Sequence, residues 1–171
     1  MVFYFIYISY MEQIDIDATD IKLLNAMQMD SSLSNQTLAK IAHISPPTCL
    51  RRVKRLKDAG LIEREVALLS PDKLAHITGQ GLTAIIEITL DHQADEQLSA
   101  FENRVIEDAA VQQCYRTSPG PDFVLIVHVT DMPEYLALGQ RLFTSDANVR
   151  NVKAFFSVKR SKFEPIVLIT Q

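Results

Sequence analysis

Residues 45–57 read Ser-Pro-Pro-Thr-Cys-Leu-Arg-Arg-Val-Lys-Arg-Leu-Lys, and this stretch decides how the N-terminal part of the chain folds. Serine is a favoured helix N-cap, and proline in the first helical turn sacrifices no hydrogen bond, so a helix is predicted to begin here. Gly60 supplies the left-handed backbone conformation that ends a helix, which places the last helical residue near Ala59. One side of this helix is predicted to be apolar and buried, and it consists of Cys49, Leu50, Val53 and Leu56.

Two shorter helices are predicted before this basic helix. The first begins after Asp17, which is placed to cap backbone amides, with Asp20 at the third helical position near the positive end of the helix dipole. The second spans residues 35–42 behind the N-cap Ser34. Its predicted buried residues are Leu38, Ile41 and Ala42. Three helices with a tight turn before the third form the helix-turn-helix arrangement.

Residues 61–69 follow the third helix at the place of a wing, and they are predicted to form one long strand or a strand pair. We therefore assign residues 11–69 to a winged helix-turn-helix domain. Ser70-Pro71-Asp72 is the clearest break in the chain, and residues 70–80 are predicted to be a linker. Residues 81–171 then form a second domain.

The second domain alternates between strand and helix patterns. Strands are predicted at residues 82–90, 111–117, 123–129 and 152–158, helices at 95–108 and 133–143, and a further strand at 165–169. The order βαββαβ is the ferredoxin-like pattern, so the predicted fold class is α+β. The antiparallel sheet of this fold has one face without helices, which we interpret as a dimer surface.

Residues 1–10 are apolar and aromatic. They are too few to span a bilayer, and they lack the basic start and small-residue cleavage site of a signal peptide. Because Met11 opens a segment that is typical of an ordinary protein start, we predict that residues 1–10 are an upstream extension. An additional strand is the alternative interpretation.

Charge is distributed unevenly along the chain. The formal net charge is -4 and the sequence pI is about 5.5, which by itself argues against a nucleic-acid binder. Residues 51–57, however, contain five cations and no acid. This indicates a localised anion-binding face on a protein that otherwise repels DNA. Cys49 and Cys114 form no disulfide framework, which fits a cytoplasmic location.

The cations lie opposite the apolar side of the predicted basic helix, where they can enter a DNA groove. Arginine forks suit guanine edges and phosphates, and the major groove admits a helix. Bases are predicted to be approached by Pro47, Thr48 and Arg51, and phosphates by Arg52, Lys54, Arg55 and Lys57. Ser34 and Asn35, at the start of the preceding helix, complete the predicted DNA-binding set. The alternative is a solvated basic face that binds nothing, and RNA is disfavoured because no aromatic residue interleaves the cations.

Several segments together resemble the leucine-responsive/asparagine-regulator (Lrp/AsnC) family of bacterial transcription regulators. The most specific is the run of serine, two prolines, threonine, cysteine and arginines in residues 44–56. The others are residues 17–24, 33–35, 60–62, 67–71, 113–114, 122–123 and 129–135. The resemblance implies that the C-terminal domain dimerises, that the homodimers assemble into tetramers or octamers, and that a free amino acid binds between dimers as effector.

The loop of residues 118–123, Ser-Pro-Gly-Pro-Asp-Phe, departs from the family pattern. Asp122 and Phe123 match, whereas Pro119 stands where the family usually has glycine. The two prolines stiffen the loop and remove backbone donors. The resemblance nominates Ser118, Gly120, Asp122, Phe155 and Ser157 as effector-binding residues. A carboxylate that caps the turn is the alternative role for Asp122.

These observations predict a sequence-specific regulator of double-stranded DNA that responds to an amino acid or a related small effector. The alternatives are an architectural DNA-binding protein with little sequence selectivity, and an amino-acid-binding module whose DNA-binding domain is vestigial. An enzyme is disfavoured because the sequence has no phosphate-binding loop, dinucleotide fingerprint or catalytic triad. Its four histidines show no metal-ligand spacing, so we expect no cofactor and no metal.

Overall fold

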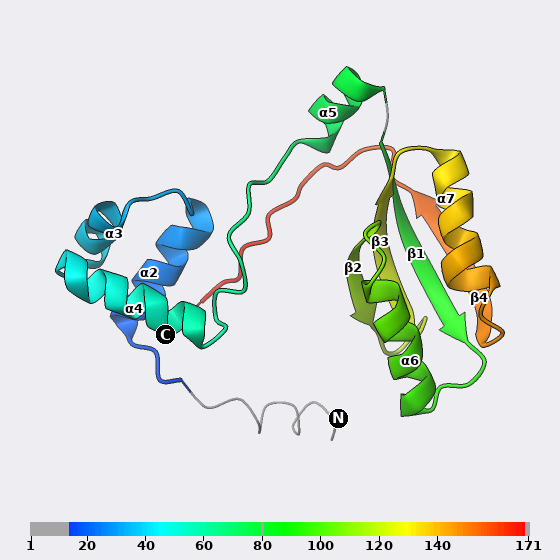
Figure 1. The fold of residues 1–171 in the computed structure, drawn as a ribbon, viewed down its shortest axis with the longest axis horizontal. Coiled ribbons are helices and arrows are strands. Elements are labelled where there is room, and N and C mark those ends of the chain that lie inside the picture. Colours follow the sequence, from blue (N-terminus) through cyan, green and yellow to red (C-terminus); the bar gives the residue numbers. More distant parts are fainter. Residues whose placement is uncertain (1–13, 80, 170–171) are drawn as a thin grey trace. The chain divides into compact units, whose positions relative to one another are not determined.

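The computed structural model describes residues 14–79 and 81–169, which divide into two compact units. The first unit contains residues 14–68 together with residues 164–169, and the second contains the described residues between 69 and 163 (Figure 1). The prediction for residues 1–10 falls outside the described residues.

The first unit is built on three helices, as the sequence predicts: α2 (Ala18–Met29), α3 (Asn35–Ala42) and α4 (Pro46–Asp58). Each begins at a side-chain cap, because Asp17, Ser34 and Ser45 accept hydrogen bonds from backbone amides of the following first turn. The helices pack around a small apolar core made of Leu23, Leu38, Ala39, Ala42 and Cys49. This core fixes α4 against the other two helices.

Two residues that were predicted to be buried lie on the surface instead. Leu50 on α4 is 63% exposed and Ile41 on α3 is 42% exposed. The prediction was wrong because it drew the apolar stripes too wide. At about 100° per residue, Leu50 points well away from the buried pair Cys49 and Leu56. Among residues 14–68 and 164–169, no further layer covers these flanking positions.

The predicted wing and linker also differ from the structure. No strand is assigned in residues 61–70 or in residues 157–169, so the strands predicted at 61–69 and 165–169 are absent. A strand needs a hydrogen-bonded neighbour, and neither segment has a ladder partner among the described residues. Part of the predicted linker is helix α5 (Pro71–Thr78), which is capped by Ser70 and ends at Gly79 in the left-handed conformation. The Ser-Pro signal that starts α4 also starts this helix.

The second unit has the predicted ferredoxin-like order. Its elements are β1 (Leu82–Leu90), α6 (Asp95–Ile106), β2 (Val111–Arg116), β3 (Phe123–Val129), α7 (Met132–Gly139), a π-helical turn (Gln140–Thr144) and β4 (Val149–Phe156). The strands form one antiparallel sheet in the order β2-β3-β1-β4. The α+β fold class is therefore confirmed.

Side chains alternate across the two central strands of the sheet. Every second residue is buried on β1 from Ala84 onward and along the whole of β3, and these residues pack against Phe101 and Val105 of α6 and Leu138 of α7. The rings of Phe101 and Phe123 lie 4.9 Å apart between centroids. Both helices thus cover one face of the sheet (Figure 1), and the opposite face is left without helices.

Phe101 is expected to carry much of the packing between α6 and the sheet. Its side chain is 1% exposed, so Phe101→Ala should lower the free energy of unfolding by about 3–5 kcal/mol through lost apolar contact and a cavity. Ile106→Ala is the matched control, because Ile106 on the same helix is 57% exposed and should change stability by about 0.5 kcal/mol or less. Urea denaturation measures both, and equal effects would contradict this account of the core.

Candidate nucleic-acid interface

The turn between α3 and α4 is held by three local interactions. His43 ends α3 in the left-handed conformation, with φ at 55°. The Asn35 side-chain amide on α3 donates a hydrogen bond of 2.9 Å to the carbonyl of Pro46 at the start of α4. Ser45 caps α4 by accepting from the amide of Thr48. The two helices therefore form a fixed pair, and the outer side of α4 has a defined orientation within the unit.

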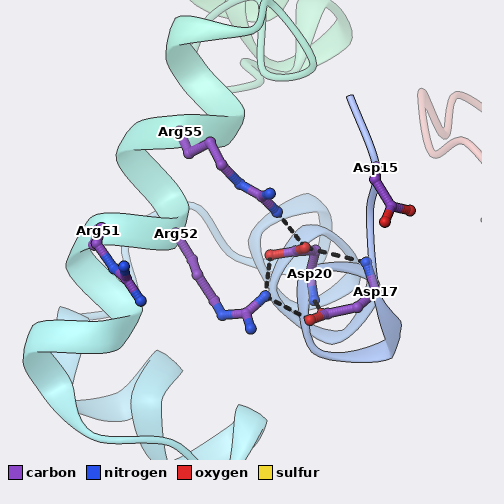
Figure 2. A pocket seen from close by; sticks show the side chains of 6 residues that line it. All are labelled: Asp15, Asp17, Asp20, Arg51, Arg52 and Arg55. Carbon is purple, nitrogen blue, oxygen red and sulfur yellow. Dashed lines mark hydrogen bonds and ion pairs between the residues drawn. The ribbon is translucent and has the colours of Figure 1, made fainter. Parts of the chain in front are cut away.

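Two arginines of α4 turn toward acidic residues at the start of α2. Arg52 Nη1 lies 2.8 Å from Asp17 Oδ2 and 2.9 Å from Asp20 Oδ1, and Arg55 Nη2 lies 2.5 Å from Asp20 Oδ2. Figure 2 shows both guanidinium groups pointing at Asp20. The side chains surround a recess of about 280 Å³ lined by Asp15, Asp17, Asp20, Arg51, Arg52 and Arg55. We name this group of six residues the acid–arginine cluster.

Asp20 is the buried centre of the acid–arginine cluster. Its side chain is 1% exposed, and its two oxygens accept hydrogen bonds from Arg52, from Arg55 and from the backbone amide of Asp17. A buried carboxylate is tolerated only when its charge is paired and its lone pairs are used. The hydrogen bonds that Arg52 donates to Asp20 first and to Asp17 second raise the pKa of Arg52.

The five cations of the basic helix thus fall into two groups. Arg52 and Arg55 are paired with α2, and Lys57 Nζ lies 2.9 Å from Glu65 Oε1. Arg51 and Lys54 are exposed, and neither forms an ion pair with any residue that the structure describes. In Figure 2 the Arg51 side chain ends short of the carboxylates. The outward charge of α4 is therefore smaller than its sequence indicates.

The other residues predicted to bind DNA have mixed surroundings. Pro47 is exposed, and the Thr48 hydroxyl shares a hydrogen bond of 2.8 Å with Ser45. The Ser34 hydroxyl caps α3, and the Asn35 amide is engaged with Pro46. On the outer side of α4 the structure brings together Pro47, Thr48, Arg51 and Lys54.

The sequence interpretation missed the role of Asp20, which it treated only as a helix-dipole residue. A signal for it was present, because Asp17 and Asp20 are three residues apart and so are Arg52 and Arg55. Positions three apart share one face of a helix, so each pair presents a double charge of one sign to its partner helix. Complementary pairs of this kind predict a contact that single positions do not.

The loop predicted to bind an effector is tied to the end of β1. Asp122 Oδ2 accepts hydrogen bonds from the Leu90 amide at 2.7 Å and from Gln93 Nε2 at 3.2 Å, and the Asp122 amide donates to the Ile88 carbonyl. Asp122 therefore ties the loop to the end of β1 and to the residues that follow it. Ser118 and Gly120 are exposed on the loop, and Gly120 has φ at 132°, where other residues are strained.

The remaining predicted effector residues lie beside the first half of β1. Phe155 on β4 pairs with Ile85, and the Ser157 amide donates to the Thr83 carbonyl. Leu90, where Asp122 binds, is seven residues from Thr83 along the strand, which corresponds to about 23 Å. One small molecule cannot touch both Asp122 and Ser157 of the same subunit.

Neither cysteine has the environment of a reactive thiolate. Burial raises the pKa of Cys49, and burial followed by the charge of Glu102 raises the pKa of Cys114 to about 11. Among residues 14–79 and 81–169, no group of three or more His, Cys, Asp or Glu side chains is arranged to hold a metal ion. Within the same residues, no helix combines the length and the apolar character that crossing a membrane requires.

Comparison with known families matches both units. Residues 16–63 match the family described as winged helix-turn-helix DNA-binding, and residues 83–167 match the family described as Lrp/AsnC ligand binding domain. The DNA-binding transcriptional activator DecR of Escherichia coli is 34% identical over 86% of this chain and 95% of its own length. The leucine-responsive regulatory protein of Rhizobium meliloti is 31% identical over 88% of this chain and 94% of its own length.

Solved structures give the same picture. An AsnC family transcriptional regulator from Agrobacterium tumefaciens superposes with a TM-score of 0.77 at 31% identity, covering 90% of this chain and 97% of that one. A transcriptional regulator from Neisseria meningitidis, solved as a complex with L-Met, also gives a TM-score of 0.77, at 29% identity over 90% of this chain and 97% of that one.

The acid–arginine cluster makes a prediction about pH. The backbone amide of Asp20 and, after it, Arg52 lower the pKa of Asp17 below its ordinary value of 3.8. The charged Asp17 therefore stabilises the fold fully above about pH 3.8, and this stabilisation is lost as the pH falls through the folded-state pKa. Asp17→Asn should reduce the fall in unfolding free energy between about pH 5 and about pH 3, measured by urea denaturation. An identical fall in wild type and variant would contradict the pairing.

Proposed function

The chain belongs to the Lrp/AsnC family of transcription regulators, and from that premise we propose that it recognises specific DNA sequences with α4. We also propose that an amino acid or a related small effector, bound where dimers meet, modulates its activity. The chain is a DNA-binding transcription regulator with a ligand-binding domain. The observation that carries the proposed reading mode is the outer side of α4, on which Arg51 and Lys54 are exposed while the opposite side is buried.

Arg51 is the residue that we propose for base recognition. It lies in the second turn of α4, and the early residues of a recognition helix are the ones that contact base edges. An arginine binds guanine O6 and N7 with two parallel hydrogen bonds, which gives sequence preference. Pro47 and Thr48 would approach the same bases, and Lys54 would contact phosphate, which positions the helix without selecting sequence.

An architectural role is the second candidate, and the charge of the protein disfavours it. Bulk wrapping of DNA relies on many phosphate contacts that release counterions. The net charge of the chain is -4, and three of the five cations on the basic helix have carboxylate partners within the protein. The attraction between the protein and the DNA backbone is therefore weak, which favours a regulator that depends on base contacts.

The effector site is proposed to be shared between subunits. Because Asp122 and Ser157 lie near opposite ends of β1, a pocket with both residues needs one of them from another copy of the chain. The sheet face without helices exposes Ile85, Tyr115 and Phe155, which gives a second copy an apolar surface to cover. The complex of the Neisseria meningitidis relative with L-Met supports an amino acid as ligand.

Substitutions on the outer side of α4 test DNA reading. Arg51→Ala should weaken binding to a duplex selected by the wild-type protein from a random library by about 1–3 kcal/mol and should relax one base preference. Lys54→Ala should weaken binding to selected and random duplexes alike and reduce the salt slope by about one. Fluorescence anisotropy at several salt concentrations measures both effects.

The control for this experiment is Lys22→Ala, which removes an exposed cation from α2. It should leave the base preference unchanged. If Arg51→Ala and wild type bind all sequences equally, Arg51 does not read bases. If the random library yields no preferred duplex at all, the protein is not sequence-specific and the architectural role is correct.

An amino-acid panel tests the effector. At least one amino acid should change the sedimentation coefficient of the full chain and shift its affinity for the selected duplex by about 5–150-fold. Asp122→Asn keeps an oxygen for the Leu90 amide but removes the charge available to a ligand ammonium group, so it should abolish both responses. Glu96→Gln, at an exposed position on α6, should preserve them. If no amino acid changes either property, the effector proposal is wrong and DNA reading is unaffected.

A further inference from the structure

The acid–arginine cluster withdraws positive charge from the helix that contacts DNA. Arg52 and Arg55 together share the carboxylates of Asp17 and Asp20, so most of their charge is compensated inside the protein. A solvated arginine would instead add its full charge to the phosphate-binding surface. This arrangement affects how the protein binds DNA, and the following inference rests on the proposed function.

The arginines are held in the cluster by the burial of Asp20. If Arg52 and Arg55 turned outward, the Asp20 carboxylate would remain in the interior as an unpaired charge, which is strongly destabilising. The Arg52 side chain reaches below the surface: its Nε atom is buried, and it has no hydrogen-bond acceptor within the described part of the chain. The phosphates of DNA therefore compete with the buried Asp20 carboxylate for these guanidinium groups. Asp20 cannot move into water with the arginines, so losing them would leave its charge unpaired.

We propose that Asp20 limits the affinity of the protein for the DNA backbone: by holding Arg52 and Arg55 in the acid–arginine cluster, it keeps them from phosphates and leaves recognition to the outer residues of α4. Backbone binding contributes equally at every sequence, whereas base contacts contribute only at the right one. Removing two phosphate contacts from each subunit therefore lowers the affinity for random and for selected duplexes by the same factor and leaves their ratio unchanged. Asp20 thereby keeps random DNA unoccupied at protein concentrations at which the selected duplex is bound.

The test is Asp20→Asn in the full chain, which keeps the side-chain shape and removes the charge that holds the arginines. Each arginine released to a phosphate should steepen the slope of log affinity against log salt by about 0.9 and raise random-duplex affinity about fivefold at ~0.15 M salt. The affinity for the selected duplex should rise by the same factor, so the selected-to-random affinity ratio should stay at its wild-type value. A wild-type slope and a wild-type affinity for random duplex in Asp20→Asn, with the fold intact by circular dichroism, would overturn the proposal.

Two further variants separate the released arginines from a change in net charge. Asp58→Asn also removes one negative charge, from the end of α4, but Asp58 has no ion-pair partner among the described residues, so the salt slope should stay at the wild-type value. Asp20→Asn combined with Arg55→Gln should return about half of the added slope. If Asp58→Asn steepens the slope as much as Asp20→Asn does, net charge explains the effect and the proposal is wrong.

Arg55→Gln alone decides the question even if Asp20→Asn fails to fold. Because Arg55 is already compensated in the wild type, Arg55→Gln should leave the salt slope unchanged, and a slope reduced by about 0.9 would overturn the proposal. Failure of the proposed function looks different: the wild-type protein would then show no preference for any duplex. A wild type that discriminates, with Arg55 contributing to the slope, rejects only the role of Asp20.

Discussion

The carboxylate of Asp20 is the interaction on which the DNA-binding unit depends. It completes the N-terminal cap of α2 through the Asp17 amide, and it binds the two arginines that face α2 from α4. One side chain therefore couples the start of one helix to the charge of another. Because it is buried, its pairing cannot be replaced by water, so α4 is oriented by an electrostatic contact as well as by the apolar core around Leu23 and Cys49.

A different constraint organises the second unit, where the alternation of side chains along β1 and β3 places α6 and α7 on one face of the sheet. We propose that a second copy of the chain covers the other face. The same strand separates the loop of Asp122 from Ser157, near its two ends. A sheet of this kind can bind a small ligand across those residues only through assembly. With the proposed shared site, ligand binding and oligomerisation would be coupled, which is the physical requirement for an effector to act at a distance.

Much of this was predictable because local signals agreed with the fold. Serine and proline caps located α3 and α4, and the order of strands and helices identified the ferredoxin-like unit. Errors arose where a residue's place depends on what lies beside it. Leu50 is apolar and helical, but it stays 63% exposed in the described part of the chain. Residues 61–69 have strand character, but they find no ladder partner among the residues that the structure describes. The ion pairs of Asp20 with Arg52 and Arg55 could not be predicted by considering one residue at a time, because they depend on α2 and α4 facing each other.

The low affinity that one α4 helix alone can have for DNA connects the roles of the two units. One α4 helix presents only Arg51 and Lys54 as uncompensated cations among the described residues of that helix, which is too little charge and too few bases for a tight complex. In the proposed assembly, a second helix would convert the second binding event into an intramolecular one, so affinity would multiply without new contacts. Compensation of Arg52 and Arg55 would then make DNA binding depend on assembly more steeply than a fully basic helix would. An effector that changes how the sheets associate can then change occupancy of DNA without contacting α4.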